Sequence, residues 1–215
     1  MLTVKRFTFN PVQENTYVVY SNKGECAIID PGCYFPAERD ELKAFIDENR
    51  LIPKYLLNTH CHLDHVFGNK WVNDTWGLEL FTHPGEKVVL DFAPASGKAW
   101  GLPFDNYTGP LHPLVAGDEV KLGDDFLKVL FMPGHSPAHI GFYNEAGGFI
   151  VSGDVLFRLS IGRTDLPGGD YEQLIASIRE QLMTLPDDTI VYCGHGDDTT
   201  VGAERKENPF LKGVS

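Results

Sequence analysis

Residues 59–65 read Thr-His-Cys-His-Leu-Asp-His, and this short segment constrains the fold more than any other part of the chain. Its polar members His60, His62, Asp64 and His65 follow the spacing His-x-His-x-Asp-His. Neutral imidazole nitrogens and carboxylate oxygens are the ligands that zinc, iron and manganese take from proteins. A solvated polar loop is the alternative interpretation. The density of ligand-type residues favours a metal site.

The residues around this segment predict how the fold presents it. Residues 55–57 form a short apolar run, typical of a buried strand that delivers the loop at its carboxyl end. The two alternating histidines then point to the same side of the extended chain. Asp64 and His65 lie where a helix can begin, and we expect residues 66–76 to continue as a helix from an Asp64 N-cap region. One loop can therefore hold parts of two metal sites.

The chain divides into two halves, each of which predicts a sheet with its own helices. In the first half, strands are expected at 4–9, 15–20 and 26–29, followed by an amphipathic helix at 36–50. In the second half, strands are expected at 119–122, 126–131, 140–143, 149–151 and 190–192, with a helix capped by Asp170. Two sheets packed face to face with helices outside follow from this order. No linker is visible, so we expect one domain over residues 1–215.

Residues 84–112 predict a helix followed by a long loop, and loops of this length are usually functional or mobile. The aromatic residues Trp100, Phe104 and Tyr107 form either a wall for a substrate or part of the core. His83, at a strand end before Pro84, and His112, in the long loop, are interpreted as surface or packing residues. His139 is a candidate for a hydrogen bond to a ligand side chain.

Three further polar residues share one context, because each follows an apolar strand and stands beside glycine. They are His135, Asp154 and His195. Glycine permits the tight backbone that brings strand ends close to a shared centre. Each residue alone has a structural interpretation, as a turn cap or a buried imidazole. Together with the 60–65 loop they supply enough ligands for two metals with a position left for water.

Charge and composition exclude several classes of function. The chain has 215 residues and a formal net charge of −12, without the basic stripe that nucleic-acid binding requires. No apolar run is long enough to span a bilayer, and residues 1–7 resemble a first strand rather than a signal core. We therefore expect a cytoplasmic protein, as a monomer or small homo-oligomer. The four cysteines are too scattered for a disulfide framework, and we expect Cys61 and Cys193 to point away from the metals.

The order His-x-His-x-Asp-His, Gly-His-Ser, Gly-Asp and Gly-His resembles the metallo-β-lactamase superfamily. The resemblance spans essentially the whole chain and implies an α/β fold, a four-layer αββα sandwich of two mixed sheets with outer helices. It implies that one metal is held by His60, His62 and His135. It implies that a second metal is held by Asp64, His65 and His195, with Asp154 bridging the two. Two divalent ions are therefore expected: zinc first, with iron or manganese fitting the same ligand set.

Within this superfamily the chain is most similar to glyoxalase II, the hydroxyacylglutathione hydrolase. Lactamase-type members usually lack the bridging aspartate, and the flavo-diiron branch replaces a loop histidine by glutamate. The tracts at 153–157 and 161–165 resemble the glyoxalase II pattern, as does the ending at 204–211. The chain looks like a short bacterial form without the full C-terminal helical domain that helps to bind glutathione. Substrate contacts are therefore assigned only to Arg163, Arg205 and Lys206, with a plain solvated helix end as the alternative for the last two.

The resemblance implies hydrolysis of a thioester such as S-lactoylglutathione by a hydroxide that bridges the metals. Metal binding lowers the pKa of water toward ~7, and a metal stabilises the oxyanion as the thiolate leaves. Asp64 is the expected catalytic residue, since it can orient the hydroxide. Three alternatives stay open: a mononuclear iron persulfide dioxygenase on the same fold, a lactone or ester hydrolase, and a non-catalytic binding module. The expected partner is a small acyl-thiol substrate.

Overall fold

A computed structural model describes residues 1–212, which form two six-stranded sheets and one two-stranded sheet. The first sheet, in spatial order, contains β1 (Leu2–Phe9), β2 (Glu14–Ser21), β3 (Glu25–Ile29), β4 (Ile52–Leu57), β5 (Leu80–Thr82) and β6 (Leu111–Pro113). The second contains β14 (Thr199–Thr200), β13 (Ile190–Cys193), β10 (Phe149–Gly153), β9 (Ile140–Asn144), β8 (Asp125–Phe131) and β7 (Glu119–Leu122). The short pair consists of β11 (Leu156–Phe157) and β12 (Ser160–Ile161).

Both large sheets are mixed. In the first sheet β1, β2 and β3 pair antiparallel, whereas β3, β4, β5 and β6 run parallel. In the second sheet only β10 and β13 are parallel. Parallel neighbours require crossover connections, and helices supply them. These crossovers bring the carboxyl ends of β4, β10 and β13 to positions from which loops can reach one centre.

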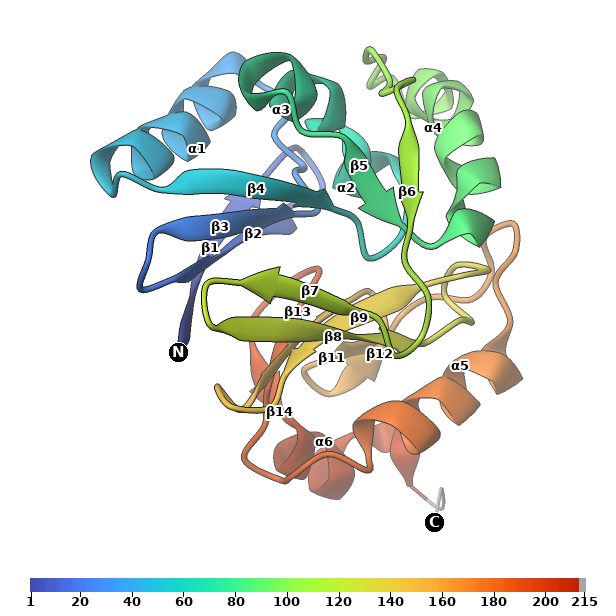
Figure 1. Cartoon of the computed structure of the whole chain (residues 1–215). Coiled ribbons are helices and arrows are strands. Elements are labelled where there is room, and N and C mark those ends of the chain that lie inside the picture. Colours follow the sequence, from blue (N-terminus) through green and yellow to red (C-terminus); the bar gives the residue numbers. More distant parts are fainter. Residues whose placement is uncertain (213–215) are drawn as a thin grey trace.

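The helices lie on the two outer faces of the paired sheets (Figure 1). Over the first sheet lie α1 (Pro36–Glu48), α3 (Asn69–Trp76) and α4 (Lys87–Ala99), with the one-turn α2 (Leu63–Val66) after β4. The second sheet is covered by α5 (Tyr171–Ser177), which continues as a π-helical turn over Ile178–Leu182, and by α6 (Val201–Glu207). Short 3₁₀ turns span Pro84–Glu86 and Pro209–Leu211. The helix–sheet–sheet–helix order confirms the predicted four-layer sandwich.

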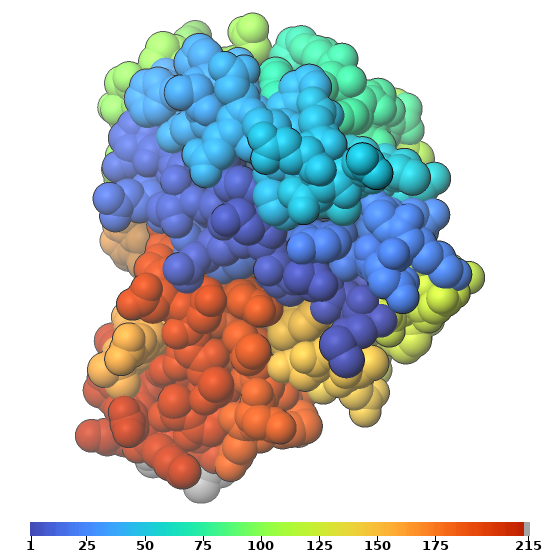
Figure 2. Space-filling view, turned by 90° about the vertical axis from the view of Figure 1, so that its left-hand side faces the viewer, coloured from blue at the N-terminus to red at the C-terminus, as the bar shows by residue number. Residues whose placement is uncertain are grey.

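Three apolar layers hold the sandwich together. The middle layer lies between the sheets and includes Val19, Ile29, Val129 and Phe142, each almost fully buried. One outer layer lies under α1, α3 and α4, and the other lies under α5 and α6. The N-terminal residues occupy the upper part of the face in Figure 2 and the C-terminal residues its lower part, so the two halves of the sequence are stacked. No helix in the described part of the chain has the length and apolar character needed to cross a bilayer.

The prediction of one continuous helix at 66–76 is wrong in two respects: the helix starts earlier, and it is interrupted. The helix begins at Leu63 with His62 as its N-cap, and α2 and α3 are separated at Gly68. The Gly68 amide donates to the carbonyl of Pro31 (2.7 Å), and a Cβ there would lie 2.5 Å from the Cys33 sulfur. This tertiary contact interrupts the helix, because the backbone is bonded across to the β3 loop instead of continuing its own turn.

Two other boundaries differ from the sequence-based expectation. His112 lies in β6 rather than in a loop, where it pairs with Phe81 of β5. A three-residue strand carries too few residues to show an alternating pattern. The first helix ends at Glu48, and Arg50 adopts a left-handed backbone conformation with φ of 54° as the chain turns into β4.

The contact between the sheets gives the first testable prediction. Phe142 is fully buried in the middle layer, so Phe142→Ala removes a large side chain from a place that cannot collapse freely. We expect the free energy of unfolding, measured by urea denaturation, to fall by about 3–5 kcal/mol. Val115→Ala, at a half-exposed position, should change it by less than about 0.5 kcal/mol. Equal effects of the two substitutions would contradict the packing of the sheets against each other.

Candidate metal centre

Seven side chains predicted as metal ligands come together beside the ends of β4, β8, β10 and β13. His60 and His62 follow β4, and Asp64 and His65 lie at or within the one-turn helix α2. The other three residues, His135, Asp154 and His195, follow β8, β10 and β13 respectively. Ligand-type atoms of His60, His62 and His135 lie within 4.8 Å of one another, as do those of Asp64, His65 and His195. These two groups adjoin, and a third group of Asp30, His60 and His65 overlaps both, with ligand-type atoms equally close together.

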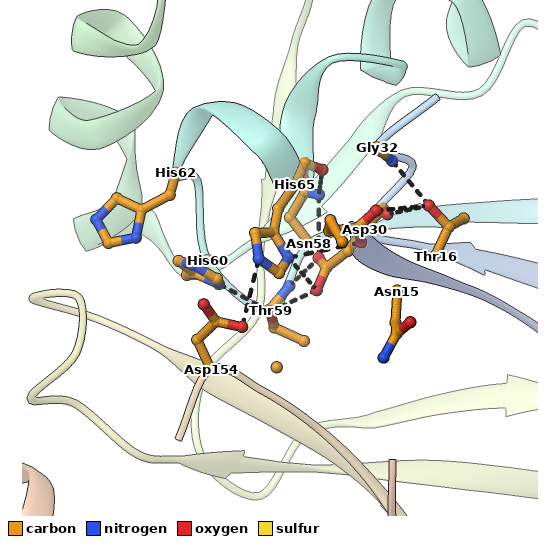
Figure 3. A network of polar contacts seen from close by, with 12 residues as sticks. Asn15, Thr16, Asp30, Gly32, Asn58, Thr59, His60, His62, His65 and Asp154 are labelled. Atoms are coloured by element: carbon orange, nitrogen blue, oxygen red, sulfur yellow. Dashed lines mark hydrogen bonds and ion pairs between the residues drawn. The ribbon is translucent and has the colours of Figure 1, made fainter. Parts of the chain in front are cut away.

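Asp154 lies between the two groups. Its Oδ2 is 3.5 Å from Nε2 of His135 in the first group and 3.5 Å from Nε2 of His195 in the second. Its Oδ1 is 3.4 Å from Nε2 of His65 (Figure 3). A carboxylate that reaches members of both groups has the placement that a bridging ligand needs.

Hydrogen bonds at the outer edges of the imidazoles leave their inner nitrogens as electron-pair donors. The Thr59 hydroxyl donates its one hydrogen to Asp30 (2.6 Å), so it accepts from Nδ1 of His60 at 3.0 Å. Nδ1 of His135 donates to the carbonyl of Arg163 (2.8 Å). In a neutral imidazole the other nitrogen, Nε2, then carries a lone pair. Both Nε2 atoms lie on the side of the centre.

The inward-facing atoms include buried polar groups without partners. Among the described residues, Nε2 of His60, Nε2 of His65 and Oδ1 of Asp154 are buried and make no hydrogen bond, and the last two face each other at 3.4 Å as an ion pair. Leaving such groups unpaired costs roughly 1–3 kcal/mol each. A divalent cation would satisfy all three, because imidazole nitrogen and carboxylate oxygen are the donors that it takes. The residues present therefore fit metal ions.

The charges of the centre also favour cations. Burial alone would raise the pKa of Asp64, but the imidazoles of His65 and His195 lower it below its ordinary value. Burial would likewise raise the pKa of Asp154, but His65 and His195 lower it below its ordinary value. Burial would lower the pKa of His65, yet Asp154 and Asp64 raise it well above its ordinary value. The carboxylates stay ionised, and together they attract positive charge to this place.

The comparisons with known proteins agree with this geometry. Residues 9–195 match the Metallo-beta-lactamase superfamily. The chain belongs to this superfamily. The hydroxyacylglutathione hydrolase GloC of Haemophilus influenzae is 39% identical over 205 residues, which cover 94% of this chain and 95% of that protein. Membership makes the chain a relative of metallo-hydrolases, and the predicted resemblance to the superfamily is confirmed.

Two solved structures are similar over nearly their whole length. The BLEG-1 B3 metallo-β-lactamase is 37% identical with a TM-score of 0.90, and the match covers 98% of this chain and 100% of that one. TTHA1623, solved in a di-iron-bound form, is 40% identical with a TM-score of 0.88, covering 96% of this chain and 100% of that one. The fold is therefore that of the superfamily, and its His and Asp groups suit divalent metals.

Sequence reasoning missed Asp30, whose carboxylate contacts both Thr59 of the first ligand loop and the imidazole of His65. Its Oδ1 accepts from the Thr59 amide (2.7 Å) and the Asn58 side chain (3.1 Å), and its Oδ2 lies 3.2 Å from Nδ1 of His65 (Figure 3). This contact turns Nε2 of His65 toward the centre. A signal existed, because Asp30 directly follows a buried strand and precedes Pro31-Gly32. That is the context that singled out Asp154.

Glu86 was missed as well, and no sequence signal pointed to it. Its carboxylate is buried and accepts from the amides of Cys61 and Ala138 (2.9 Å each) and from the Ser136 hydroxyl (2.6 Å). Burial raises its pKa above the ordinary value, against these hydrogen bonds. Glu86 therefore ties the first ligand loop to the loop that carries His135.

The remaining histidines and cysteines stay outside the two groups. His139 accepts from the Asp154 amide at 3.2 Å and stacks on His60, as expected for a hydrogen-bonding neighbour of a ligand. The His83 ring lies tilted against Phe131, and His112 pairs with Glu79. The described cysteines are all free and buried, and none belongs to a ligand group.

A cavity of about 860 Å³ reaches the centre, and it includes only some of the predicted substrate contacts. Arg163 and Trp100 line it, whereas Phe104 packs half-buried against the core beneath α4 and Tyr107 is buried in that core. Within residues 1–212 the lining includes neither Arg205 nor Lys206. Arg205 instead donates to the carbonyl of Met183 and forms an ion pair with Asp187. The geometry does not bring the last two residues to the site.

The position of Asp30 yields the second prediction. In Asp30→Asn one carboxylate oxygen becomes an amide nitrogen, which cannot accept from its present donors. We expect zinc affinity, measured by competition with a chromophoric chelator, to fall by about 10–100-fold, as for other groups that orient ligands. Asp74→Asn, on the exposed side of α3, is the matched control and should bind zinc normally. Unchanged affinity in Asp30→Asn would mean that His65 does not depend on this carboxylate.

Proposed function

We propose that this protein is a metal-dependent hydrolase of thioesters, of which S-lactoylglutathione is the first to test. The observation that carries the proposal is the convergence of seven ligand-type side chains, together with inner atoms of His60, His65 and Asp154 that are buried without a hydrogen bond. The likeness to GloC, described as a hydroxyacylglutathione hydrolase, supports this substrate class. Zinc is the proposed metal, and the likeness to a di-iron-bound protein keeps iron as an alternative.

The proposed ligands form two sets of three, with Asp154 between them. His60, His62 and His135 would hold one ion, and Asp64, His65 and His195 the other, with Asp154 shared. Bound divalent ions supply a lowered pKa for water and an electrophilic partner for a carbonyl oxygen. Burial and the nearby His135 lower the pKa of His62 to about 3, so this imidazole is neutral and ready to coordinate.

Asp64 is proposed to orient the attacking water. Its carboxylate lines the cavity, and its Oδ2 accepts from Nε2 of His195 at 3.1 Å. Because nearby imidazoles hold its pKa below the ordinary value, it remains ionised and can accept a hydrogen bond from water. It thereby fixes the direction from which the oxygen approaches a carbonyl carbon in the cavity.

The cavity lining favours a leaving group that needs no proton. Apart from the proposed ligands, the ionisable residues lining it within the described chain are Cys61 and Arg163. Burial raises the pKa of the Cys61 thiol well above its ordinary value, and a guanidinium does not release its proton. A thiolate, whose conjugate acid has a pKa of about 8.5, leaves unaided, whereas an amine does not. Thioesters and activated esters therefore fit this site better than simple amides.

A second candidate is β-lactam hydrolysis, which the likeness to the BLEG-1 lactamase favours. A lactam is a strained amide, so ring strain replaces part of the assistance that an ordinary amide leaving group requires. The two candidates differ in substrate and share the same centre. Their relative rates on one preparation decide between them.

The third prediction tests the reaction directly. Zinc-loaded protein should hydrolyse S-lactoylglutathione with release of one thiol per ester, followed by a thiol reagent, and should turn over nitrocefin more slowly. Chelator treatment should abolish the activity and added zinc should restore it. Faster nitrocefin turnover would favour the second candidate. Oxygen consumption on glutathione persulfide by a form with one iron per chain would favour a persulfide dioxygenase.

The fourth prediction concerns the shared carboxylate. Asp154→Ala should lower thioester turnover by at least about 100-fold, since replacing groups one layer further out already costs 10–100-fold. Metal content, measured by mass spectrometry, should fall below that of the parent while the circular dichroism spectrum stays the same. Asp124→Ala removes an exposed aspartate paired with Lys23 and should keep full activity. Near-normal turnover in Asp154→Ala would refute the bridging role.

A further inference from the structure

One face of α4 exposes large apolar side chains. Val88, Phe92 and Trp100 have exposed fractions of 66%, 57% and 58%. Phe92 follows Val88 by four residues and Trp100, the C-cap residue, follows Phe92 by eight, so the three side chains lie on one side of the helix. Large apolar side chains gathered on one exposed face often mark a binding surface.

This apolar face is a wall of the cavity that holds the metal centre. Val88, Phe92 and Trp100 all line the cavity, together with Val89 and Ala93 of the same helix. Further apolar lining residues are Leu102, Phe157, Ile161, Leu166 and Pro167. The volume of about 860 Å³ lies within the usual range for small-molecule sites.

The same lining offers little to a charged substrate arm. Arg163 is the one Lys or Arg among the described lining residues. Its guanidinium donates two hydrogen bonds of 2.7 Å to Asp165, so its charge is already balanced. Glutathione carries two carboxylates and an ammonium group, and it would find few partners here. An apolar chain would instead remove the exposed face of α4 from water.

Accordingly, we propose that the α4 face binds an apolar acyl chain and that medium-length acyl thioesters are preferred over thioesters of small hydroxy acids. The inference rests on the proposed thioester hydrolysis for its chemistry, but the apolar subsite is a property of the cavity itself. The reacting carbonyl would lie at the centre and the chain would extend along Val88, Phe92 and Trp100.

Two features favour a substrate chain over a second copy of the protein as the occupant. The exposed side chains line the same cavity as His62, Asp64 and His135, so a protein seated on them would close off the reactive centre. The start of α4 is also fixed to the centre, because Glu86, its N-cap residue, binds the amides of Cys61 and Ala138. A wall held rigidly beside reacting groups suits substrate positioning.

The experiment compares acetyl, butanoyl, hexanoyl and octanoyl thioesters of N-acetylcysteamine, an uncharged thiol, on the zinc-loaded protein. We expect kcat/KM to rise by about threefold to fourfold per added methylene until the chain outgrows the cavity. Phe92→Ser should lower the octanoyl-to-acetyl ratio by about tenfold. Phe126→Ser, at an exposed phenylalanine of β8 outside the cavity lining, is the matched control and should leave the ratio unchanged.

Binding without turnover separates this inference from the proposed function. The uncleavable thioethers S-ethyl- and S-octyl-N-acetylcysteamine are titrated against tryptophan fluorescence, and the octyl compound should bind at least about 100-fold more tightly. Preference for the octyl compound without hydrolysis of any thioester would uphold the apolar subsite and refute the proposed function. Hydrolysis with a kcat/KM that does not change with acyl length, together with equal affinities for the two thioethers, would uphold the proposed function and refute the apolar subsite. A dimer that Phe92→Ser dissociates, with the acyl profile unchanged, would overturn the subsite in favour of a second copy.

Discussion

Burial of polar atoms without hydrogen bonds at the candidate metal centre is the constraint on which the rest of the structure depends. Nε2 of His60, Nε2 of His65 and Oδ1 of Asp154 are removed from water without a hydrogen-bonding partner. Such groups are tolerated only where the surrounding structure holds them rigidly or where a ligand satisfies them. The two sheets meet this demand, because strand ends from both converge on one place and the three apolar layers prevent those ends from separating.

Rigid outer contacts turn this convergence into a defined chemistry. Thr59 and the Arg163 carbonyl fix the protons of His60 and His135 on their outer nitrogens. Asp30 contacts Nδ1 of His65 and so turns Nε2 toward the centre, and it is itself held by Thr59 and Asn58. If these groups were absent, each imidazole could present a proton instead of a lone pair to the centre. The outer contacts therefore determine that the site attracts cations.

The sequence predicted most of the fold and the ligand-type residues that come together, but not the groups that orient them. Apolar runs and the 60–65 spacing suffice for strands and ligands, since both are local patterns. Glu86 reads as an ordinary acidic residue at a helix start, and only the folded chain shows that it binds Cys61, Ser136 and Ala138. The break at Gly68 likewise depends on a contact with Pro31, which is distant in sequence. The apolar residues of α4 show the same helical spacing whether they face the core or a cavity, so the spacing alone does not reveal the cavity wall.

The proposed reaction and the proposed selectivity lie on different parts of this topology. Every proposed ligand follows β4, β8, β10 or β13, whereas α4 connects β5 with β6, two parallel strands that carry none of them. A crossover between parallel strands must be long, so it can accommodate different helices without moving a ligand strand. Glu86 fixes the start of this crossover to both ligand loops. Changes in the exposed side chains of α4 can thus alter the cavity wall while the metal centre keeps its geometry.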